Sequence, residues 1–369
     1  MKDKLIAFCK KETVFVVSAF AAVISAFLVP PSKEYLSYPD YRVLSLLFCL
    51  MIIVAGFKEL GIFTLLGKKL TVKAKDSRTL TLLLVMLCFF SSMFITNDVA
   101  LITFVPFGLE LLQMAGLKEK MIKVVVLQTI AANLGSMFTP IGNPQNLYLY
   151  SLAEMGIGEF LLLMLPLCII SLFLLLIVIF GEKPVTIAKQ EAEEGKKIDR
   201  KSVIVLSALF LVCLLNVVRI LPFQVMLVIV AAAILFRNKS LYIKVDYCLL
   251  GTFLGFFIFV ENMQRISIVK ELLETLLGGR ELYLSVLASQ VISNVPAAML
   301  LSGFTDQYKE LIYGVNIGGL GTLIASLASV ISYKSYASFQ DAKKGKYMAV
   351  FTLYNLIFLV ILLVAGTIF

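Results

Sequence analysis

Long apolar segments recur along the whole chain, and several approach the roughly 20 residues that a helix needs to cross a bilayer. Hydrophobic residues fill 60% of the 369 positions and charged residues only 15%, which is far from the usage of soluble domains. We therefore expect an all-α integral membrane protein, because backbone groups find no water in hydrocarbon. The nine expected crossings are 13–29, 42–57, 121–152, 159–180, 202–217, 221–236, 246–262, 308–333 and 347–367.

Two of these crossings are interrupted by the same residue types in one register. The first interruption holds Asn133, Gly135, Thr139 and Ile141, and the second, 183 positions later, holds Asn316, Gly318, Thr322 and Ile324. A lipid-facing helix does not tolerate such breaks, because the freed backbone groups would stay unpaired. The matched pair therefore predicts two broken helices that line a binding site.

A candidate hairpin of two apolar limbs precedes each broken helix. The first spans 79–113 with the tip Thr96-Asn97-Asp98, and the second spans 281–303 with the tip Ser293-Asn294-Val295. Equivalent helices are five crossings apart, and because five is odd the two repeats have opposite orientations. The sequence thus predicts an inverted-topology repeat with two re-entrant hairpins, the first entering from the cytoplasmic side and the second from outside.

This repeat divides the chain into three parts. They are a first repeat at 1–180 with the broken helix 121–152, a cytoplasmic linker at 181–201, and a second repeat at 202–369 with the broken helix 308–333. The helix at 202–217 belongs to the third part and has no counterpart in the first. The charged, helix-like stretches 58–78 and 263–280 are typical of helices that lie along a membrane interface.

Lysines and arginines concentrate on one side of this topology. The expected cytoplasmic segments are 1–12, 58–78, 114–123, 181–201, 237–245 and 334–346, and the opposite side holds Lys33, Arg42, Arg219, Arg265, Lys270, Arg280 and Lys309. The positive-inside rule then predicts a multi-pass protein of the cytoplasmic membrane, with its N-terminus cytoplasmic and its C-terminus outside. This topology explains the net charge of +9, so the expected partner is the lipid bilayer and no nucleic acid is expected.

Common enzyme and cofactor signatures are missing from the sequence. It has no histidine, no phosphate-binding loop and no nucleophile elbow, which argues against an enzyme and against a bound cofactor. The cysteines are isolated and indicate small apolar side chains rather than a metal or redox site. They are Cys9, Cys49, Cys88, Cys168, Cys213 and Cys248.

The tips and breaks carry the candidate binding residues. Amide and hydroxyl side chains and half-helix N-termini attract an anion, while freed carbonyls can coordinate a cation. The candidate substrate-binding residues are Thr96, Asn97, Thr139, Pro140, Gly142, Asn143, Asn146, Ser293, Asn294 and Thr322. The two candidate Na⁺ sets are Thr96, Asn97, Asp98, Asn133, Gly135 and Gly142 in the first half, and Ser293, Asn294, Asn316 and Gly318 in the second.

Asp98 breaks the symmetry, because its counterpart at the second tip is Val295. An ionisable residue at membrane depth is costly and therefore indicates function. We expect Asp98 to be a Na⁺ ligand or a proton carrier, with a helix-start carboxylate stabilised by the helix dipole as the structural alternative.

These motifs resemble the ion transporter superfamily. The resemblance rests on the two tips, the two breaks and the string from Thr139 to Asn146, and it is strongest to the divalent anion:sodium symporters, which include citrate and dicarboxylate carriers, and to the arsenite permease and sodium/proton antiporter branches. It implies a homodimer with a scaffold domain and an elevator-type transport domain. In the symporters both tips read Ser-Asn-Thr and bind sodium and substrate carboxylates. Here Asp98 and Val295 replace both threonines, so this chain is a divergent member.

The sequence therefore predicts a secondary transporter that moves a small anion, a carboxylate or an oxyanion, by alternating access. Na⁺ or H⁺ is the expected coupling ion. A Na⁺/H⁺ antiporter and an arsenite efflux permease remain alternatives within the superfamily, and a channel or a membrane-embedded enzyme is the alternative from another class.

Overall fold

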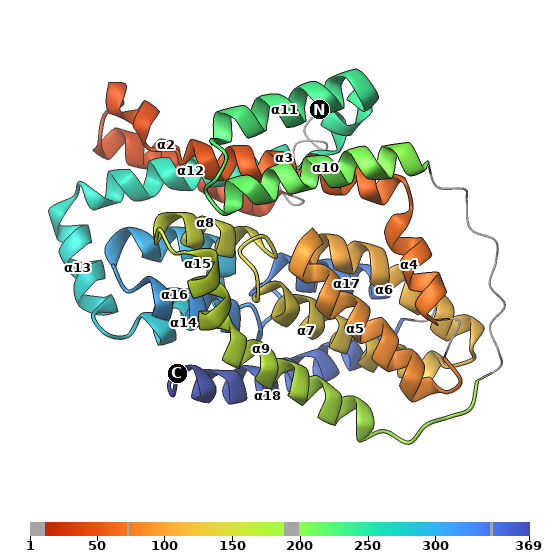
Figure 1. The fold of residues 1–369 in the computed structure, drawn as a ribbon. Coiled ribbons are helices and arrows are strands. Elements are labelled where there is room, and N and C mark those ends of the chain that lie inside the picture. The colour runs from red at the N-terminus through yellow and green to blue at the C-terminus, as the bar shows by residue number, and fades with distance from the viewer. Residues whose placement is uncertain (1–11, 72–73, 188–198, 340–341) are drawn as a thin grey trace, which may run out of the picture. The chain divides into compact units, whose positions relative to one another are not determined.

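The computed structural model describes residues 12–71, 74–187, 199–339 and 342–369, and these form helices joined by short loops (Figure 1). The first half contains α2 (Thr13–Leu28), α3 (Tyr41–Glu59), α4 (Ile62–Thr71), α5 (Ser77–Ile95), α6 (Asn97–Met114), α7 (Met121–Ser136), α8 (Pro144–Leu152) and α9 (Ile157–Phe180). The second half contains α10 (Arg200–Val217), α11 (Phe223–Asn238), α12 (Tyr247–Gln264), α13 (Ser267–Leu277), α14 (Glu281–Ile292), α15 (Asn294–Leu301), α16 (Tyr308–Ile317), α17 (Leu327–Ala337) and α18 (Lys344–Gly366).

Among the described residues, seven helices are long and apolar enough to cross a membrane. Six of them, α3, α9, α10, α11, α12 and α18, match expected crossings, and the seventh is α5, which the sequence predicted as a hairpin limb. Each predicted broken helix is divided into two helices, α7 with α8 and α16 with α17. The chain is thus an all-α, multi-pass membrane protein.

The helices gather into two compact units, and each unit takes segments from both halves of the sequence. Of the described residues, those within 1–56, 204–281 and 298–308 form the first unit, and those within 57–203, 282–297 and 309–369 form the second. Both broken helices and both hairpin tips fall in the second unit.

Small residues and buried amides hold the first unit together. A Cβ at Gly255 of α12 would lie 2.9 Å from the backbone of Ser18 in α2, so glycine is what lets these two helices approach. At the end of α12, Asn262 donates hydrogen bonds to the Ser25 hydroxyl (3.0 Å) and to the Tyr35 hydroxyl (2.8 Å). The polar contacts fix α2 and the loop that follows it against α12.

Helix α7 forms the centre of the second unit. Its residues from Val124 to Ser136 are buried all round, and it packs against α5, α6, α9, α17 and α18. A helix that is apolar or small on every face belongs in the interior of a protein. The break that follows Ser136 is therefore enclosed by protein.

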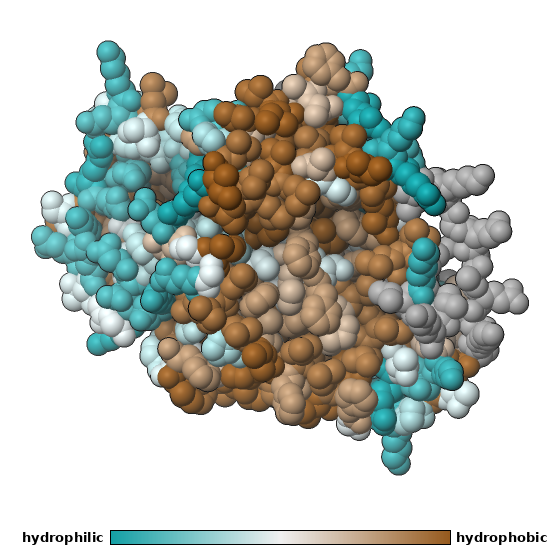
Figure 2. All heavy atoms as spheres, in the orientation of Figure 1, coloured by the Kyte–Doolittle hydropathy of each residue, from teal (hydrophilic) through white to brown (hydrophobic). Residues whose placement is uncertain are grey.

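The outer helices of the second unit carry exposed apolar side chains. In α9, Leu162, Ile169 and Phe173 are exposed, whereas Phe160, Met164 and Leu167 on the other face are buried. Figure 2 shows hydrophobic side chains over much of the visible surface, including the region where α9 lies in Figure 1. Apolar side chains on the outside fit a surface that faces lipid tails rather than water.

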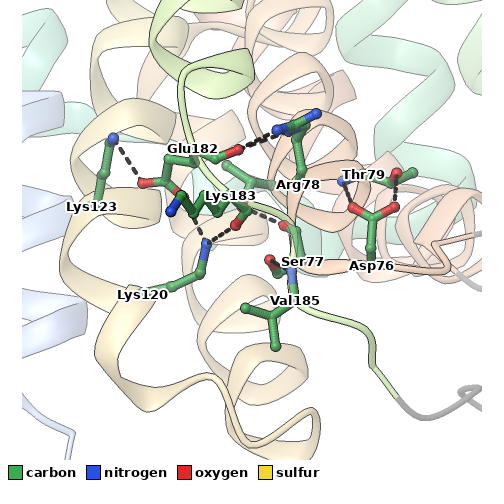
Figure 3. Close-up of polar contacts among 10 residues, drawn as sticks. Asp76, Ser77, Arg78, Thr79, Lys120, Lys123, Glu182, Lys183 and Val185 are labelled. Atoms are coloured by element: carbon green, nitrogen blue, oxygen red, sulfur yellow. Dashed lines mark hydrogen bonds and ion pairs between the residues drawn. The ribbon is translucent and has the colours of Figure 1, made fainter.

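The chain that leaves α9 is fastened to two other helices of the second unit (Figure 3). The Glu182 carboxylate accepts hydrogen bonds from Lys120 (2.8 Å) and pairs with Lys123 (2.7 Å). Burial alone would raise the pKa of the Glu182 carboxyl, but the hydrogen bonds from Lys120 and Lys123 outweigh burial and the net pKa lies below its usual value. The two lysines thus favour the carboxylate form of Glu182, which joins the end of α9 to the start of α7.

A second set of bonds ties the same segment to the start of α5. The backbone N–H of Ser77 donates to the Val185 carbonyl (2.8 Å), and the Arg78 guanidinium donates to the Glu182 carbonyl (3.0 Å). Residues 182–187 thus form a strap that joins α5, α7 and α9. It brings together three of the segments that the sequence predicts on the cytoplasmic side, 58–78, 114–123 and 181–201.

Several sequence predictions fall outside the described residues. They concern Cys9, the N-terminal cytoplasmic segment up to residue 11, and residues 188–198 of the predicted linker. The cysteines that are described are free thiols, and Cys49, Cys88, Cys168 and Cys213 are buried, as expected of small apolar side chains.

Candidate functional site

Both hairpin tips turn at a residue with positive φ. Thr96, between α5 and α6, has φ 70°, and Ser293, between α14 and α15, has φ 73°. Neither residue is a glycine, and for a β-branched threonine this conformation is a genuine outlier. Such strain persists only where the surroundings enforce it, and it clusters at ligand-binding and switch regions. The two tips are therefore built alike and are both strained.

Each tip docks on the break of its own half through one backbone hydrogen bond. The Asn97 N–H donates to the Gly142 carbonyl (3.2 Å), and the Asn294 N–H donates to the Ala325 carbonyl (3.0 Å). Gly142 and Ala325 occupy matched positions, because both precede the N-cap residue of the second helix in their break. The tip and the break thus meet in the same way in both halves.

The threonine of each break makes a second matched contact. Thr139 donates its hydroxyl to the Met93 carbonyl, and Thr322 donates to the Gln290 carbonyl (3.1 Å). Met93 and Gln290 each lie three residues before the strained tip residue. These hydroxyls have a structural partner, and their oxygen lone pairs remain as acceptors.

The glycines of the breaks allow the hairpins to approach closely. A Cβ at Gly135 would lie 2.7 Å from the Ser92 hydroxyl and 2.0 Å from the Phe89 carbonyl, and a Cβ at Gly318 would lie 2.7 Å from the Ser289 hydroxyl. Real Cβ atoms do not come this near to other atoms, so both positions require glycine or a shift of the backbone. The predicted glycines therefore serve helix packing in the structure.

Asn133 connects the two halves. Its side-chain oxygen accepts hydrogen bonds from the Asn97 amide (3.0 Å) and from the Ser326 hydroxyl (3.0 Å), and its amide donates to Ser329 (3.4 Å). Asn97 begins α6, and Ser326 is the N-cap of α17. One buried side chain thus joins the starts of two helices from different halves.

Asn316 makes the corresponding connection from the other half. Its side-chain oxygen accepts from the Asn143 amide (3.2 Å), and its own amide donates to the Asn146 side-chain oxygen (2.6 Å). Asn143 also caps α8 by accepting a hydrogen bond from the Asn146 N–H (2.9 Å). The two matched asparagines, Asn133 and Asn316, therefore hold the two breaks against each other.

The N-termini of four helices meet in this network. They are the starts of α6 at Asn97, α8 at Asn143, α15 at Asn294 and α17 at Ser326. The unpaired N–H groups and the dipole of a helix make its N-terminus a place for negative charge. Among the described residues whose side chains bond in this network, the polar groups are amides and hydroxyls, and the Asp98 carboxylate lies at its edge. The arrangement can therefore hold an anion without a cationic side chain.

The two tip asparagines differ in how much of their amide is used. Asn97 donates to Asn133 and accepts from the Asp98 N–H (3.0 Å). As a whole residue Asn294 is only 5% exposed, and its side chain makes a hydrogen bond with none of the residues that the structure describes. A nearly buried amide without a protein partner calls for a ligand or water.

Asp98 lies in the first turn of α6, next to the first tip, and it is half-buried. Its counterpart Val295 is buried. A carboxylate near a helix N-terminus is stabilised by the dipole. The acid predicted from the sequence therefore stands at the edge of the network, in one half only.

The candidate residues all lie in the second unit, and most of them belong to the network. Pro140 is buried inside the first break, and Thr322 is exposed at the second. Three residues that the sequence does not predict, Ser326, Ser329 and Gln290, also bond within the network. Their signal is weak, because a serine or a glutamine in a membrane helix is common and Gln290 is matched by Met93 rather than by another amide.

The fold and the site define a multi-pass helical membrane protein with a polar centre at two helix breaks. Comparison with known proteins places it further. A family model described as a citrate transporter matches residues 4–305. The chain therefore belongs to the citrate transporter family, which confirms the resemblance to the ion transporter superfamily and makes it a transporter.

Individual relatives agree with this assignment. An uncharacterized transporter of Methanocaldococcus jannaschii is 32% identical over 289 residues, which cover 78% of each chain. The inner membrane protein YbiR of Escherichia coli is 30% identical over 309 residues, or 82% of each chain. A silicon efflux transporter of Oryza sativa is 31% identical over 146 residues, which cover 40% of this chain and 30% of that protein.

Proposed function

We propose that this protein is a secondary active transporter that moves a small anion, a carboxylate or an oxyanion, across the cytoplasmic membrane. The observation that carries the proposal is the meeting of four helix N-termini, those of α6, α8, α15 and α17, in one network of asparagines and serines. An anion held there exchanges its hydration for N–H, amide and hydroxyl donors. Membership of the citrate transporter family supports the same class of substrate.

The coupling ion of this proposal is Na⁺ or H⁺, bound in the first half. Asp98 is the acid of the site, and it supplies either a carboxylate ligand or a protonatable group. The backbone carbonyl of Gly142 accepts a hydrogen bond from the Asn97 N–H, and that of Gly135 accepts from both Met137 and Phe138. The Gly142 oxygen keeps one lone pair, so a cation near Asp98 would share this oxygen with a protein donor.

Alternating access completes the proposal. The second unit carries all of the candidate residues, so it acts as the transport domain and the first unit as the scaffold of an elevator-type homodimer. The matched φ values at Thr96 and Ser293 and the matched hydrogen bonds of the tips support an inverted repeat with two re-entrant hairpins. We propose a cytoplasmic N-terminus, an external C-terminus and short amphipathic helices α4 and α13 at the membrane interface.

A second function within the family is exchange of Na⁺ for H⁺ without an organic substrate. The position of Asp98 in the first turn of α6 favours it, because one carboxylate that binds either ion in turn is sufficient for exchange. Efflux of a small oxyacid such as arsenite is a variant of the lead proposal, and the likeness to a silicon efflux transporter favours it.

A ligand screen on purified protein tests the lead proposal. Citrate, succinate, sulfate, phosphate and arsenite are each added in sodium and in potassium buffer, at acid and at alkaline pH, and the melting temperature is recorded. A ligand that binds only the folded state raises this temperature. We expect at least one anion to do so, with a dependence on Na⁺ or on pH. A response to Na⁺ and pH alone, with no anion effective, would favour the exchanger.

A further inference from the structure

One side-chain amide of the second hairpin forms hydrogen bonds with three backbone groups of the second break. Gln290 in α14 donates its side-chain N–H groups to the carbonyls of Gly318 (2.9 Å) and Leu320 (3.0 Å). Its side-chain oxygen accepts a hydrogen bond from the Thr322 N–H (2.8 Å). A break in a helix leaves carbonyls and N–H groups without their usual partners, and each of them costs free energy if it stays unpaired. Gln290 supplies three of the missing bonds.

The first half has no glutamine at the matched position, which is occupied by Met93. There the amide comes from Asn146 in α8, which donates to the carbonyls of Met137 (3.1 Å) and Thr139 (3.3 Å). The residue matched to Asn146 in the second half is Ser329, because each lies three residues after the N-cap of its helix. Met137 and Leu320 are themselves matched, so the two amides serve the same carbonyl.

We propose that Gln290 and Asn146 are positioning residues with the same task, which is to pair the backbone groups that a helix break leaves without partners. The two halves take this amide from different elements. The first break is closed by its own second helix, and the second break is closed by its hairpin. Gln290 therefore fastens the second hairpin to its break with three side-chain bonds that the first hairpin lacks. The inference rests on the proposed function only in so far as it concerns transport.

Neighbouring residues fit this difference in the source of the amide. Gly321 has φ 101°, and a Cβ there would lie 2.3 Å from the side-chain oxygen of Gln290. In the first half, Phe138 occupies the position matched to Gly321, and Met93 occupies the position matched to Gln290. Space for the amide is thus present only in the half that uses it.

Gln290→Met is the first test, because methionine has nearly the same length and cannot form hydrogen bonds. Hydrogen exchange of the backbone amides is measured on the purified protein, without substrate. We expect faster exchange in 318–326, where the Thr322 N–H loses its acceptor, and unchanged exchange in 133–142. Gln113→Met, at an exposed position of α6, is the matched control and should change neither segment. Unchanged exchange at 318–326 in Gln290→Met would overturn the proposal, as would an equal increase in both breaks.

A swap in the first half tests the equivalence of the two amides. Asn146→Ser should lower the melting temperature, and Met93→Gln added to it should restore part of the loss, because the new glutamine can reach the carbonyls that Asn146 served. Met93→Gln alone should not stabilise the protein. If the double variant melts no higher than Asn146→Ser, the two amides do not perform the same task and the proposal is contradicted. Should Gln290→Met fail to fold, Gln290→Glu keeps the acceptor for Thr322 and should protect that amide while transport, where it is measurable, still falls.

Neither test depends on a transported substrate. A failed ligand screen would count against the proposed function, and it would not change the interpretation of the hydrogen-exchange and melting-temperature results. If the proposed function holds, Gln290→Met should in addition lower the maximal transport rate more than it raises KM, since Gln290 itself does not touch the substrate.

Discussion

The two halves of the site share a backbone plan and differ in what their side chains do. In both, a strained hydroxyl residue turns the hairpin, the next residue donates its N–H to the break, and a threonine hydroxyl bonds to the hairpin. Only the first half has an acid, Asp98, and a tip asparagine whose amide is engaged. Only the second has a tip amide, that of Asn294, without a partner among the described residues. The matched positions thus share backbone geometry and differ in side-chain chemistry.

This division suggests separate tasks for the halves. A carboxylate beside a helix start suits cation or proton coupling, whereas a free amide at a helix start suits an oxygen of the substrate. Substitutions at matched positions are the way to test the difference.

The largest effect is expected at the residue that precedes the second helix of each break. A Cβ at Gly142 would lie 2.1 Å from the Ser136 carbonyl oxygen, which is backbone and cannot rotate away, whereas alanine already stands at the matched position 325. Gly142→Ala should lower the free energy of unfolding by about 3 kcal/mol, and Ala325→Gly by about 1 kcal/mol. Reversible unfolding in detergent measures both. Equal losses would show that the two breaks are less different than their glycine pattern implies.

A smaller effect, on ion dependence, is expected at the third tip residue. Asp98→Asn should reduce the ion-dependent part of transport by about tenfold or more, which corresponds to about 1.4 kcal/mol. The reason is that the neutral amide binds a cation weakly and neither takes up nor releases a proton when the pH is varied. Val295→Asn, the same residue placed at the second tip, should leave the dependence on Na⁺ or pH unchanged. Flux into proteoliposomes at varied Na⁺ and pH provides the measurement. Intact ion dependence in Asp98→Asn would remove coupling from the first half.

The smallest effect is expected at the strap of residues 182–187, which belongs to neither tip and serves as a reference. The pKa of Glu182 is lowered in the folded protein, so its contribution to stability is present above the unfolded pKa and is lost as the pH falls toward the folded value. For a partly exposed ion pair the loss is a few tenths to about 1 kcal/mol. Glu182→Gln should flatten this part of the pH dependence of the melting temperature. Glu110→Gln, at an exposed carboxylate of α6, is the control that should leave it unchanged.

Much of this architecture is readable from the sequence, because matched residue types carry it. The apolar runs predict six of the long helices, and Asn133, Gly135 and Thr139 with their partners 183 positions later predict where the two helices break. These positions are governed by backbone requirements, namely a close approach at glycine and a polar group at a break, and such requirements leave the same residue type in both halves.

The contacts between the halves were not predictable in the same way. Asn133 bonds to Ser326 and Asn316 bonds to Asn143, and nothing in the spacing of one half says which residue of the other it meets. Gln290 was missed because its task is performed by a residue at an unmatched position in the first half. Matched residue types therefore predict the positions where both halves use the same residue. They do not predict positions where the two halves perform one task with residues at different places.

The claim that two unequal halves form one site is tested most directly by flux into proteoliposomes, using the anion that stabilises the protein most in the ligand screen. Wild type, Asn97→Ala, Asn294→Ala and the double variant are compared at equal amounts of folded protein. If the halves form one site, each single variant abolishes transport and the double variant is no worse. Two single variants that each keep about half of the wild-type flux, with only the double variant inactive, would show two independent sites and contradict the account.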